Sequence, residues 1–468
     1  FLSSSGYTII LPSVWQYLFR EFDVNSEAIL GAVIGVYALG QLLSSMCLGW
    51  MATRVSVTWI FLVCFLLDIV GCWIYIFSWD FWPLLFARFF AGCAGGAITI
   101  SRAYSTLMAH ISDQSNKQSS SSSSSSAYHR SSFMSRLFIA EAMGFVAGPV
   151  LGALMWSVDI KFSVFEINQF TAPAYIQIVL ALVGCLILLI FFRNLGPLGG
   201  HSTLNIVHRP LSSAKERSRV ARLNPLMQGY DEQETMRNTT GMVVCLILWF
   251  CVVASFSLFE VIATPVQLTE FRWGTLENGL FFGFAAFVSI ISSLFLTYLT
   301  SRPHQSTVRL SIRLALMIGF GIMIGCWIGL YPWAGDNHLN VYQWVVCGAV
   351  LTGVGFMTCS ISILTIYSSI FGMFNPGVYM SWLSGVGSVA RLIGPVVGGL
   401  LIHYANATVI VYATVSVLLV GFLFSLFVLH RLSPKITPPN DLLLEIWQEE
   451  QEYQDIQADD LDLLFDDR

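Results

Sequence analysis

Twelve long apolar runs dominate this sequence. A helix needs about 20 mostly apolar residues to cross roughly 30 Å of hydrocarbon. A lone strand at that depth would leave its amide groups unsatisfied, and the runs lack the alternation of a membrane barrel. The sequence therefore predicts an all-α integral membrane protein with twelve transmembrane helices. The predicted spans are 1–19, 29–51, 57–77, 82–107, 134–157, 173–192, 242–268, 278–300, 311–332, 341–366, 377–403 and 407–430.

The composition agrees with a protein that faces lipid. Of 468 residues, 55% are hydrophobic and 11% are charged, which is too little charge for an ordinary soluble surface. With 23 Lys and Arg against 28 Asp and Glu, a nucleic-acid partner is a poor fit. The ten Cys lie in apolar runs without the paired spacing of a zinc or redox site. We expect buried thiols, and neither a metal nor a cofactor.

The runs divide into two groups of six. Residues 1–192 are the predicted N-terminal six-helix bundle and residues 242–430 the C-terminal one. A basic polar segment, 193–241, is the predicted linker, and an acidic tail, 431–468, follows the second bundle. A Ser-rich insert at 109–133 cannot bury apolar area, so we expect it to be disordered.

Basic residues in the loops predict the orientation. If the linker is cytosolic, the loops on its side and the tail collect 17 Lys and Arg, whereas the opposite loops hold only Arg20, Lys161 and Arg272. Such an excess marks the cytosolic face of a membrane protein. We therefore expect both ends of the chain in the cytosol.

The two halves carry a repeated motif. Gly148-Pro149-Val-Leu-Gly152 in the fifth run recurs as Gly394-Pro395-Val-Val-Gly398 in the eleventh. Small residues let a neighbouring helix approach closely and proline bends the axis, although tight packing alone explains the motif equally well. Parallel repeats place a solute path at the interface of the halves. The predicted packing and gating residues are Gly144, Gly148, Pro149, Gly152, Pro265, Gly394, Pro395 and Gly398.

Three arginines lie inside predicted spans. Each costs about 2.5 to 3.5 kcal/mol at the centre of a membrane helix, so each needs a partner or a water path. We predict that Arg88 and Arg391 face a cavity and attract an anionic or polar solute, with a structural salt bridge as the alternative for Arg88. Arg102 lies near a helix end, where we expect its side chain to extend to the membrane surface.

Three carboxylates also lie at membrane depth, where acids are candidates for proton exchange. Glu260, five residues before Pro265, is the strongest candidate for coupling, with a fixed ion pair as the alternative. Glu141 is the second candidate, and for Asp68 we expect a structural role. All eight His lie in loops or near helix ends, so a buried proton relay must use carboxylates.

The repeated motif and the six-plus-six arrangement resemble the antiporter-type signature of the major facilitator superfamily. Three segments resemble a narrower group, the lysosomal major facilitator domain-containing protein 8 family, also called the ceroid-lipofuscinosis neuronal 7 family. These segments are 87–104, 258–265 and 377–395. The resemblance implies an endolysosomal membrane carrier, with permeation of anions such as chloride discussed for the family.

Carried over position by position, this resemblance marks six residues: Arg88, Arg102, Glu260, Pro265, Tyr379 and Arg391. Glu141 departs from the family pattern, which has an uncharged amide there, and Asp68 has no counterpart. The tail holds Asp459 four residues before the pair Leu463-Leu464, a pattern typical of sorting signals read by trafficking adaptors. Chance in an acidic, Leu-rich tail is the alternative.

The sequence therefore predicts a transporter that moves a small anionic or polar solute by alternating access, with or without proton coupling, in an endolysosomal or vacuolar membrane. The alternatives are a channel-like anion pore and a transport-silent scaffold that recruits trafficking partners. An intramembrane enzyme is not expected. At membrane depth the sequence has no His or Cys cluster, Ser–base arrangement or phosphate loop.

Overall fold

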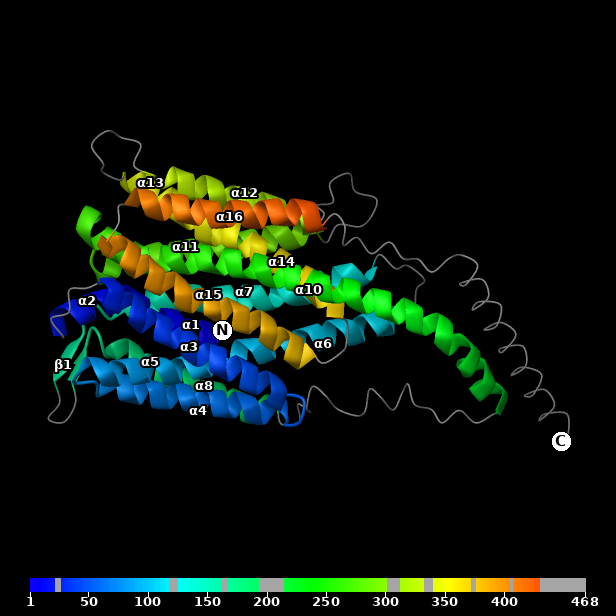
Figure 1. The fold of residues 1–468 in the computed structure, drawn as a ribbon. Helices are drawn as coiled ribbons and strands as arrows, with labels where there is room; N and C mark the ends of the chain where they lie inside the picture. The colour runs from blue at the N-terminus through cyan, green and yellow to red at the C-terminus, as the bar shows by residue number, and fades with distance from the viewer. Residues whose placement is uncertain are drawn as a thin grey trace.

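The computed structural model is built almost entirely of helices that run side by side (Figure 1). At some helix ends only the backbone is described. The residues that the structure describes are 1–21, 27–117, 125–161, 166–192, 214–300, 312–331, 340–371, 376–404 and 407–429.

The elements form two groups in chain order. The first group is α1 (Leu2–Thr8), α2 (Leu11–Glu21), α3 (Glu27–Met51), α4 (Val57–Ile76), α5 (Phe81–Gly95), α6 (Ala97–Lys117), α7 (Ser125–Leu154), β1 (Asp159–Lys161), β2 (Glu166–Asn168) and α8 (Ala172–Phe191). The second group is α10 (Ala214–Phe271), α11 (Thr275–Thr300), α12 (Ile312–Gly329), α13 (Val341–Val350), the π-helix η1 (Leu351–Phe356), α14 (Met357–Phe371), α15 (Pro376–Tyr404) and α16 (Ala407–Leu429). The two short strands pair antiparallel.

Eleven helices of the described part are long and apolar enough to cross a membrane. They begin and end within a few residues of the predicted second to twelfth spans. Helices α5 and α6 together make one span, and α13, η1 and α14 make another. The prediction of an all-α membrane protein is confirmed.

The first predicted span is not one continuous helix. It consists of α1 and α2, which are separated by a bend at Ile9 and Ile10. Pro12 has no amide hydrogen to donate to the carbonyl of Thr8, and its ring crowds that carbonyl. The amides of Ser13 and Val14 donate instead to the carbonyl of Ile10, at 3.1 and 3.0 Å. The first span is therefore broken just before its proline, at Ile9 and Ile10.

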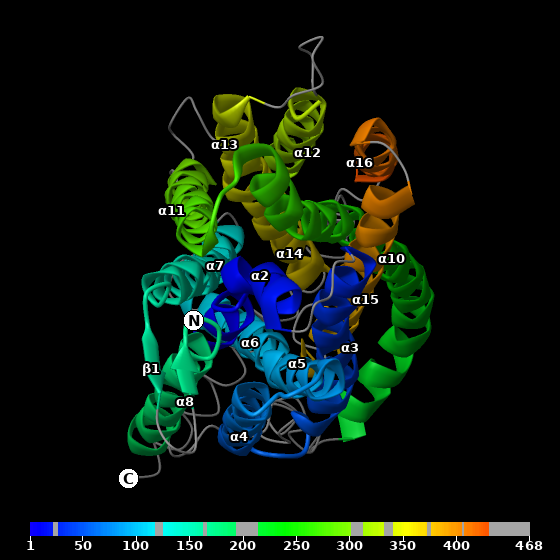
Figure 2. The ribbon, with the colours of Figure 1, turned by 90° about the vertical axis from the view of Figure 1, so that its left-hand side faces the viewer.

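Seen along the helix axes, the two groups stand against each other (Figure 2). Helix α3 of the first group packs along α15 of the second, and α7 packs along α11. Small residues permit this close packing. A Cβ at Gly31 would come closer than 3.0 Å to the backbone of α15, and a Cβ at Gly279 would come closer than 3.0 Å to the backbone of α7. The arrangement as two groups of helices is as predicted.

The repeated motif makes equivalent contacts in both groups. In α7, a Cβ at Gly148 would come closer than 3.0 Å to Thr8 Oγ1 of the group's first passage. In α15, a Cβ at Gly394 would come equally close to Ser257 Oγ of α10. The fifth span (α7) thus packs on the first (α1), and the eleventh span (α15) packs on the seventh (α10), as a duplicated fold requires. Pro149 and Pro395 lie inside their helices.

The polar segments are only partly described. Helix α6 runs to Lys117 and α7 begins at Ser125, so the flanks of the Ser-rich insert extend the neighbouring helices instead of being disordered. Extension of an existing helix avoids the cost of nucleating a new one, which explains this correction. Helix α10 likewise begins inside the predicted linker. Residues 118–124 and 193–213, and the tail with Asp459, Leu463 and Leu464, lie outside the described residues.

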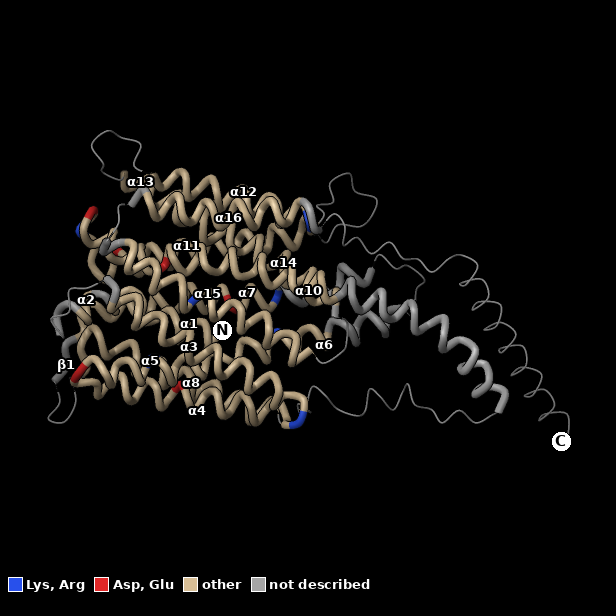
Figure 3. Tube along the Cα trace, in the orientation of Figure 1, with Lys and Arg blue, Asp and Glu red and all other residues tan. Residues whose placement is uncertain are grey.

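Charged residues are sparse along the body of the bundle and more frequent at its ends (Figure 3). We call the end at which α10 enters the bundle, at the right in Figure 1, the linker end. The domain boundaries and the cytosolic placement of both chain ends stay predictions.

Candidate functional site

A cavity of about 50 Å³ lies between the two groups. Residues of α1, α2 and α7 line it from the first group, and residues of α10, α11, η1 and α14 from the second. Most of the lining is hydrocarbon or aromatic, and Glu260 is the one ionisable residue among the described residues that line it. We call this space the central cavity. It has room for a few water molecules, each of which needs about 10–15 Å³.

Glu260 is held by a residue of the other group. The hydroxyl of Tyr7, on α1, donates a hydrogen bond of 2.8 Å to Glu260 Oε2, on α10. Both side chains are buried. Because the bond joins the two groups, any rocking of one group against the other must stretch or break it.

Arg391, on α15, completes this arrangement. Its guanidinium carbon lies 5.5 Å from the centre of the Tyr7 ring, within the range of a cation–π contact, and its charge interacts with Glu260. Among the described residues, Arg391 has no ion pair within 4.0 Å. The structure thus brings the predicted residues Glu260 and Arg391 together, through a tyrosine that the sequence did not single out.

Arg88 lies one aromatic ring further away. Its guanidinium carbon is 5.1 Å from the centre of the Tyr37 ring, and the Tyr37 and Tyr7 ring centres are 4.8 Å apart. The side chain is 2% exposed, and Nε and Nη1 find no hydrogen-bond partner in the described part of the chain. Within the described part of the chain Arg88 forms no salt bridge, and it does not line the central cavity. Its link to Glu260 runs through the two tyrosines.

A second cavity, of about 30 Å³, lies nearer the linker end, and we call it the linker-end cavity. Trp249 lines it and stands 11 residues before Glu260 in α10, a separation of roughly 16 Å along a helix. Arg391, Arg102 and Glu141 line it too. This cavity is therefore richer in charge than the central one.

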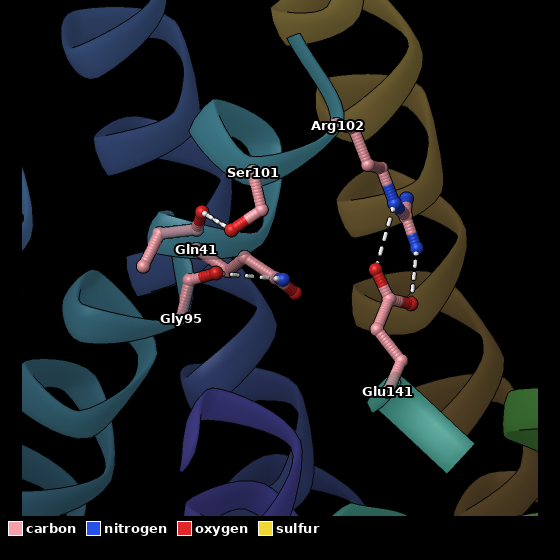
Figure 4. Close-up of polar contacts among 6 residues, drawn as sticks. Gln41, Gly95, Ser101, Arg102 and Glu141 are labelled. Carbon is pink, nitrogen blue, oxygen red and sulfur yellow. Dashed lines mark hydrogen bonds and ion pairs between the residues drawn. The ribbon is translucent and has the colours of Figure 1, made fainter. Parts of the chain in front are cut away.

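Glu141 and Arg102 form a bidentate ion pair beside the linker-end cavity (Figure 4). Arg102 Nη2 donates to Glu141 Oε2 at 2.9 Å, and Nε donates to Oε1 at 3.2 Å. Arg102 is 8% exposed, so it does not extend to the membrane surface as expected. Its guanidinium carbon also lies 5.7 Å from the Trp249 ring centre, across the interface. The nearby acid satisfies the arginine more fully than the distant surface would.

Asp68 belongs to a polar cluster inside the first group, and its charge interacts with Arg88. Gln177 Nε2, on α8, donates to Asp68 Oδ2 at 2.6 Å. Both side chains are buried, and Asp68 lines a space of about 10 Å³ together with Tyr37. That volume holds about one water molecule. The structural role expected for Asp68 stays a prediction.

Sequence reasoning missed the aromatic residues of the site. Tyr7, Tyr37, Phe145 and Trp249 lie in apolar runs, where an aromatic residue looks like ordinary packing. It also missed η1, a π-helix whose Thr352 and Phe356 line the central cavity. π-Helical turns often occur at functional sites. No group of three or more His, Cys, Asp or Glu that could hold a metal occurs among the described residues.

Comparison with known proteins agrees with this architecture. The family model for the Major Facilitator Superfamily matches residues 1–380. The chain belongs to the major facilitator superfamily. It is also similar to major facilitator superfamily domain-containing protein 8 of Xenopus laevis, with 24% identity over 457 residues that cover 85% of this chain and 82% of that protein. The similarity to this narrower group confirms the resemblance seen in the sequence.

Among solved structures, the fold is similar to that of the human organic anion transporter MFSD10 (TETRAN). The TM-score is 0.57, with coverage of 91% of this chain and 96% of that one. The identity is 16%, so this similarity shows the major facilitator fold and nothing finer. Membership of the superfamily makes the chain a membrane transporter, with a small-molecule solute and a lipid environment.

Proposed function

We propose that this transporter moves a small anionic or polar solute by alternating access, with proton coupling through Glu260. One observation carries the proposal: Tyr7, Glu260 and Arg391 meet between the two groups, beside the central cavity. Arg391 is a partly buried cation without an ion pair among the described residues, and such a cation attracts an anion. A buried acid next to it is suited to exchange a proton.

The coupling follows from charge balance. While Glu260 is ionised, it is a counter-charge for Arg391. A solute anion that arrives at Arg391 takes over that role, and Glu260 then holds a proton. By linkage, proton binding and anion binding favour each other to the same extent. Solute and proton then cross together as the groups rock and the bond from Tyr7 breaks.

Two comparisons support parts of this proposal. The solved transporter with a similar fold is described as an organic anion transporter, which supports an anionic solute. The resemblance to the lysosomal domain-containing protein 8 family supports an endolysosomal membrane. The excess of Lys and Arg in the loops on the linker side supports cytosolic chain ends, and the pattern of Asp459, Leu463 and Leu464 supports trafficking adaptors on the acidic tail.

The test is solute flux in proteoliposomes that contain the purified full chain. Inorganic anions, carboxylates, amino acids and sugars are offered with and without an imposed pH gradient. Saturable uptake that the gradient drives above equilibrium supports the proposal. Arg391→Gln should abolish uptake, and Glu260→Gln should abolish the response to pH while exchange continues.

Matched controls use exposed residues of the same types, Arg54→Gln and Glu270→Gln, which should leave flux unchanged. Flux that survives both site substitutions would rule out the assigned roles. Unitary current steps would favour the channel-like alternative. Deletion of 431–468 separates a carrier, which keeps its flux, from a scaffold, which loses its function.

A further inference from the structure

A mostly apolar cavity and a cavity lined by charged residues lie next to each other between the groups, and Phe145 lines both. The central cavity is bounded mostly by apolar side chains, and the rings of Phe256 and Phe356 stack on its wall with centres 4.1 Å apart. Of the described residues in its lining, Glu260 alone is ionisable. Such a lining favours a hydrocarbon or aromatic group over a hydrated ion.

The linker-end cavity contains donors without acceptors. Trp249 Nε1 and Ser384 Oγ have no hydrogen-bond partner among the residues that the structure describes, although the two residues are only 4% and 7% exposed. The bidentate pair with Arg102 neutralises Glu141, so Arg391 is the cation in this lining that forms no ion pair within 4.0 Å among the described residues, and its charge interacts with Glu260. A buried donor without an acceptor is costly. Two such donors and the guanidinium of Arg391 are suited to bind a compact anion, which replaces Glu260 as the counter-charge.

We propose that the solute is an amphipathic monoanion that lies through both cavities. Its compact anionic head, such as a carboxylate, binds Arg391, Trp249 and Ser384. Its apolar body enters the central cavity. This inference rests on the proposed function and deepens it by giving the solute class and the direction in which the solute lies.

The apolar body of the solute must displace the ring of Phe145, which lines both cavities. Its ring packs edge-on against Tyr7, with centres 6.4 Å apart and planes at 79°. The two cavities, of about 50 and 30 Å³, each hold only a small group while this ring stands between them. Tyr7 donates to Glu260, so movement of Phe145 also disturbs the bond that joins the two groups. Entry of the body is thereby linked to rocking.

The experiment varies the apolar body while the head stays constant. Straight-chain carboxylates from acetate to octanoate are titrated into the purified protein, and affinity is read from thermal stabilisation. Each buried methylene should raise affinity about three- to fourfold, the factor that corresponds to about 0.8 kcal/mol. Alkylammonium ions of the same lengths partition similarly but carry the opposite charge, and they should not stabilise the protein. Stabilisation by both series would overturn the proposed head site.

Variants locate each end of the solute. Ala285→Leu and Ala286→Leu fill the central cavity from α11, so octanoate should bind at least tenfold more weakly while acetate binding stays within twofold. Retained acetate binding also shows that these variants are folded. Ala413→Leu, at an exposed position of α16, is the matched control and should change neither. Arg391→Gln should abolish binding of every carboxylate.

Two results separate this inference from the proposed function. In the first, anions are transported, but either carboxylate affinity does not depend on chain length or its increase with chain length persists in Ala285→Leu and Ala286→Leu. That result would show that the proposal of an amphipathic solute is wrong, while the proposal of an anion carrier would stand. If none of these anions is bound or transported, both are wrong.

Discussion

Tyr7 donates its hydroxyl hydrogen to Glu260 across the interface between the two helix groups, at 2.8 Å. The bond joins residues 253 positions apart in the sequence, and both are buried. It places Glu260, the proposed proton-exchanging group, where the groups must separate. Removal of the hydroxyl should therefore change coupling more than it changes folding.

Tyr7→Phe keeps the ring that packs on Tyr37 and Arg391 and removes only the bond to Glu260. We expect uptake driven by a pH gradient to fall at least tenfold, while solute exchange without a gradient falls less than threefold. A hydrogen bond to a charged group contributes about 1.5 to 3 kcal/mol, so the protein should stay folded. The two flux assays in proteoliposomes check this. Tyr342→Phe, which alters a residue that is 81% exposed, is the control, and equal loss in both assays would contradict the prediction.

The buried pair of Arg102 and Glu141 should respond strongly to removal of one partner. Either Arg102→Met or Glu141→Leu leaves an uncompensated charge in the bundle, which costs about 3 to 5 kcal/mol. The double variant removes both charges and should regain most of the stability. Thermal unfolding of the two single variants and the double variant gives the coupling energy directly. Additive losses in the double variant would mean that the pair does not act as a unit.

The glycines of the repeated motif should not accept a methyl group. At Gly148 and Gly394 a Cβ would come closer than 3.0 Å to Thr8 Oγ1 and Ser257 Oγ, so alanine should destabilise either group by about 1 to 3 kcal/mol. The matched control is Gly321→Ala in α12, because a Cβ there meets nothing within 4 Å. It should be neutral or slightly stabilising. Thermal unfolding distinguishes them, and equal melting temperatures for all three would show that close approach is not what the motif provides.

A hydrogen bond at the end opposite the linker end should hold that side closed. Thr275 Oγ1, at the start of α11, donates to Gln16 Oε1 of α2 at 2.6 Å, across the interface. Thr275→Val keeps the shape and removes the donor, so opening on that side should become easier.

The measurement is labelling of a cysteine introduced at Phe282, in the central cavity, by a membrane-impermeant thiol reagent from that side. We expect at least threefold faster labelling than in the parent that carries only this cysteine change. Thr269→Val is the control, because that hydroxyl bonds within its own helix, to the carbonyl of Pro265. A rate that rises equally in both variants would point to general loosening.

Local chemistry was sufficient to predict the helices. Spans from 29–51 onward could be read from the length and polarity of each apolar run, because a helix in lipid satisfies its own backbone whatever surrounds it. The break in the first span was harder to predict, since the apolar run is continuous there and only Pro12 marks the break. The duplicated motif could likewise be recognised because its glycines recur in the same order in both halves.

The pairing of the charges could not be read from the sequence. Glu260, Arg391 and Glu141 stood out because a charge at membrane depth is costly, yet nothing local indicated that Glu141 would pair with Arg102 and Glu260 with Tyr7. Arg102 and Glu141 lie on α6 and α7, which pack together inside the first group, whereas Tyr7 and Glu260 meet only when the two groups pack together. The sequence by itself determined which segments cross the membrane and which residues are costly there. Only the tertiary structure decided which charge stays unpaired, because that depends on distances between helices.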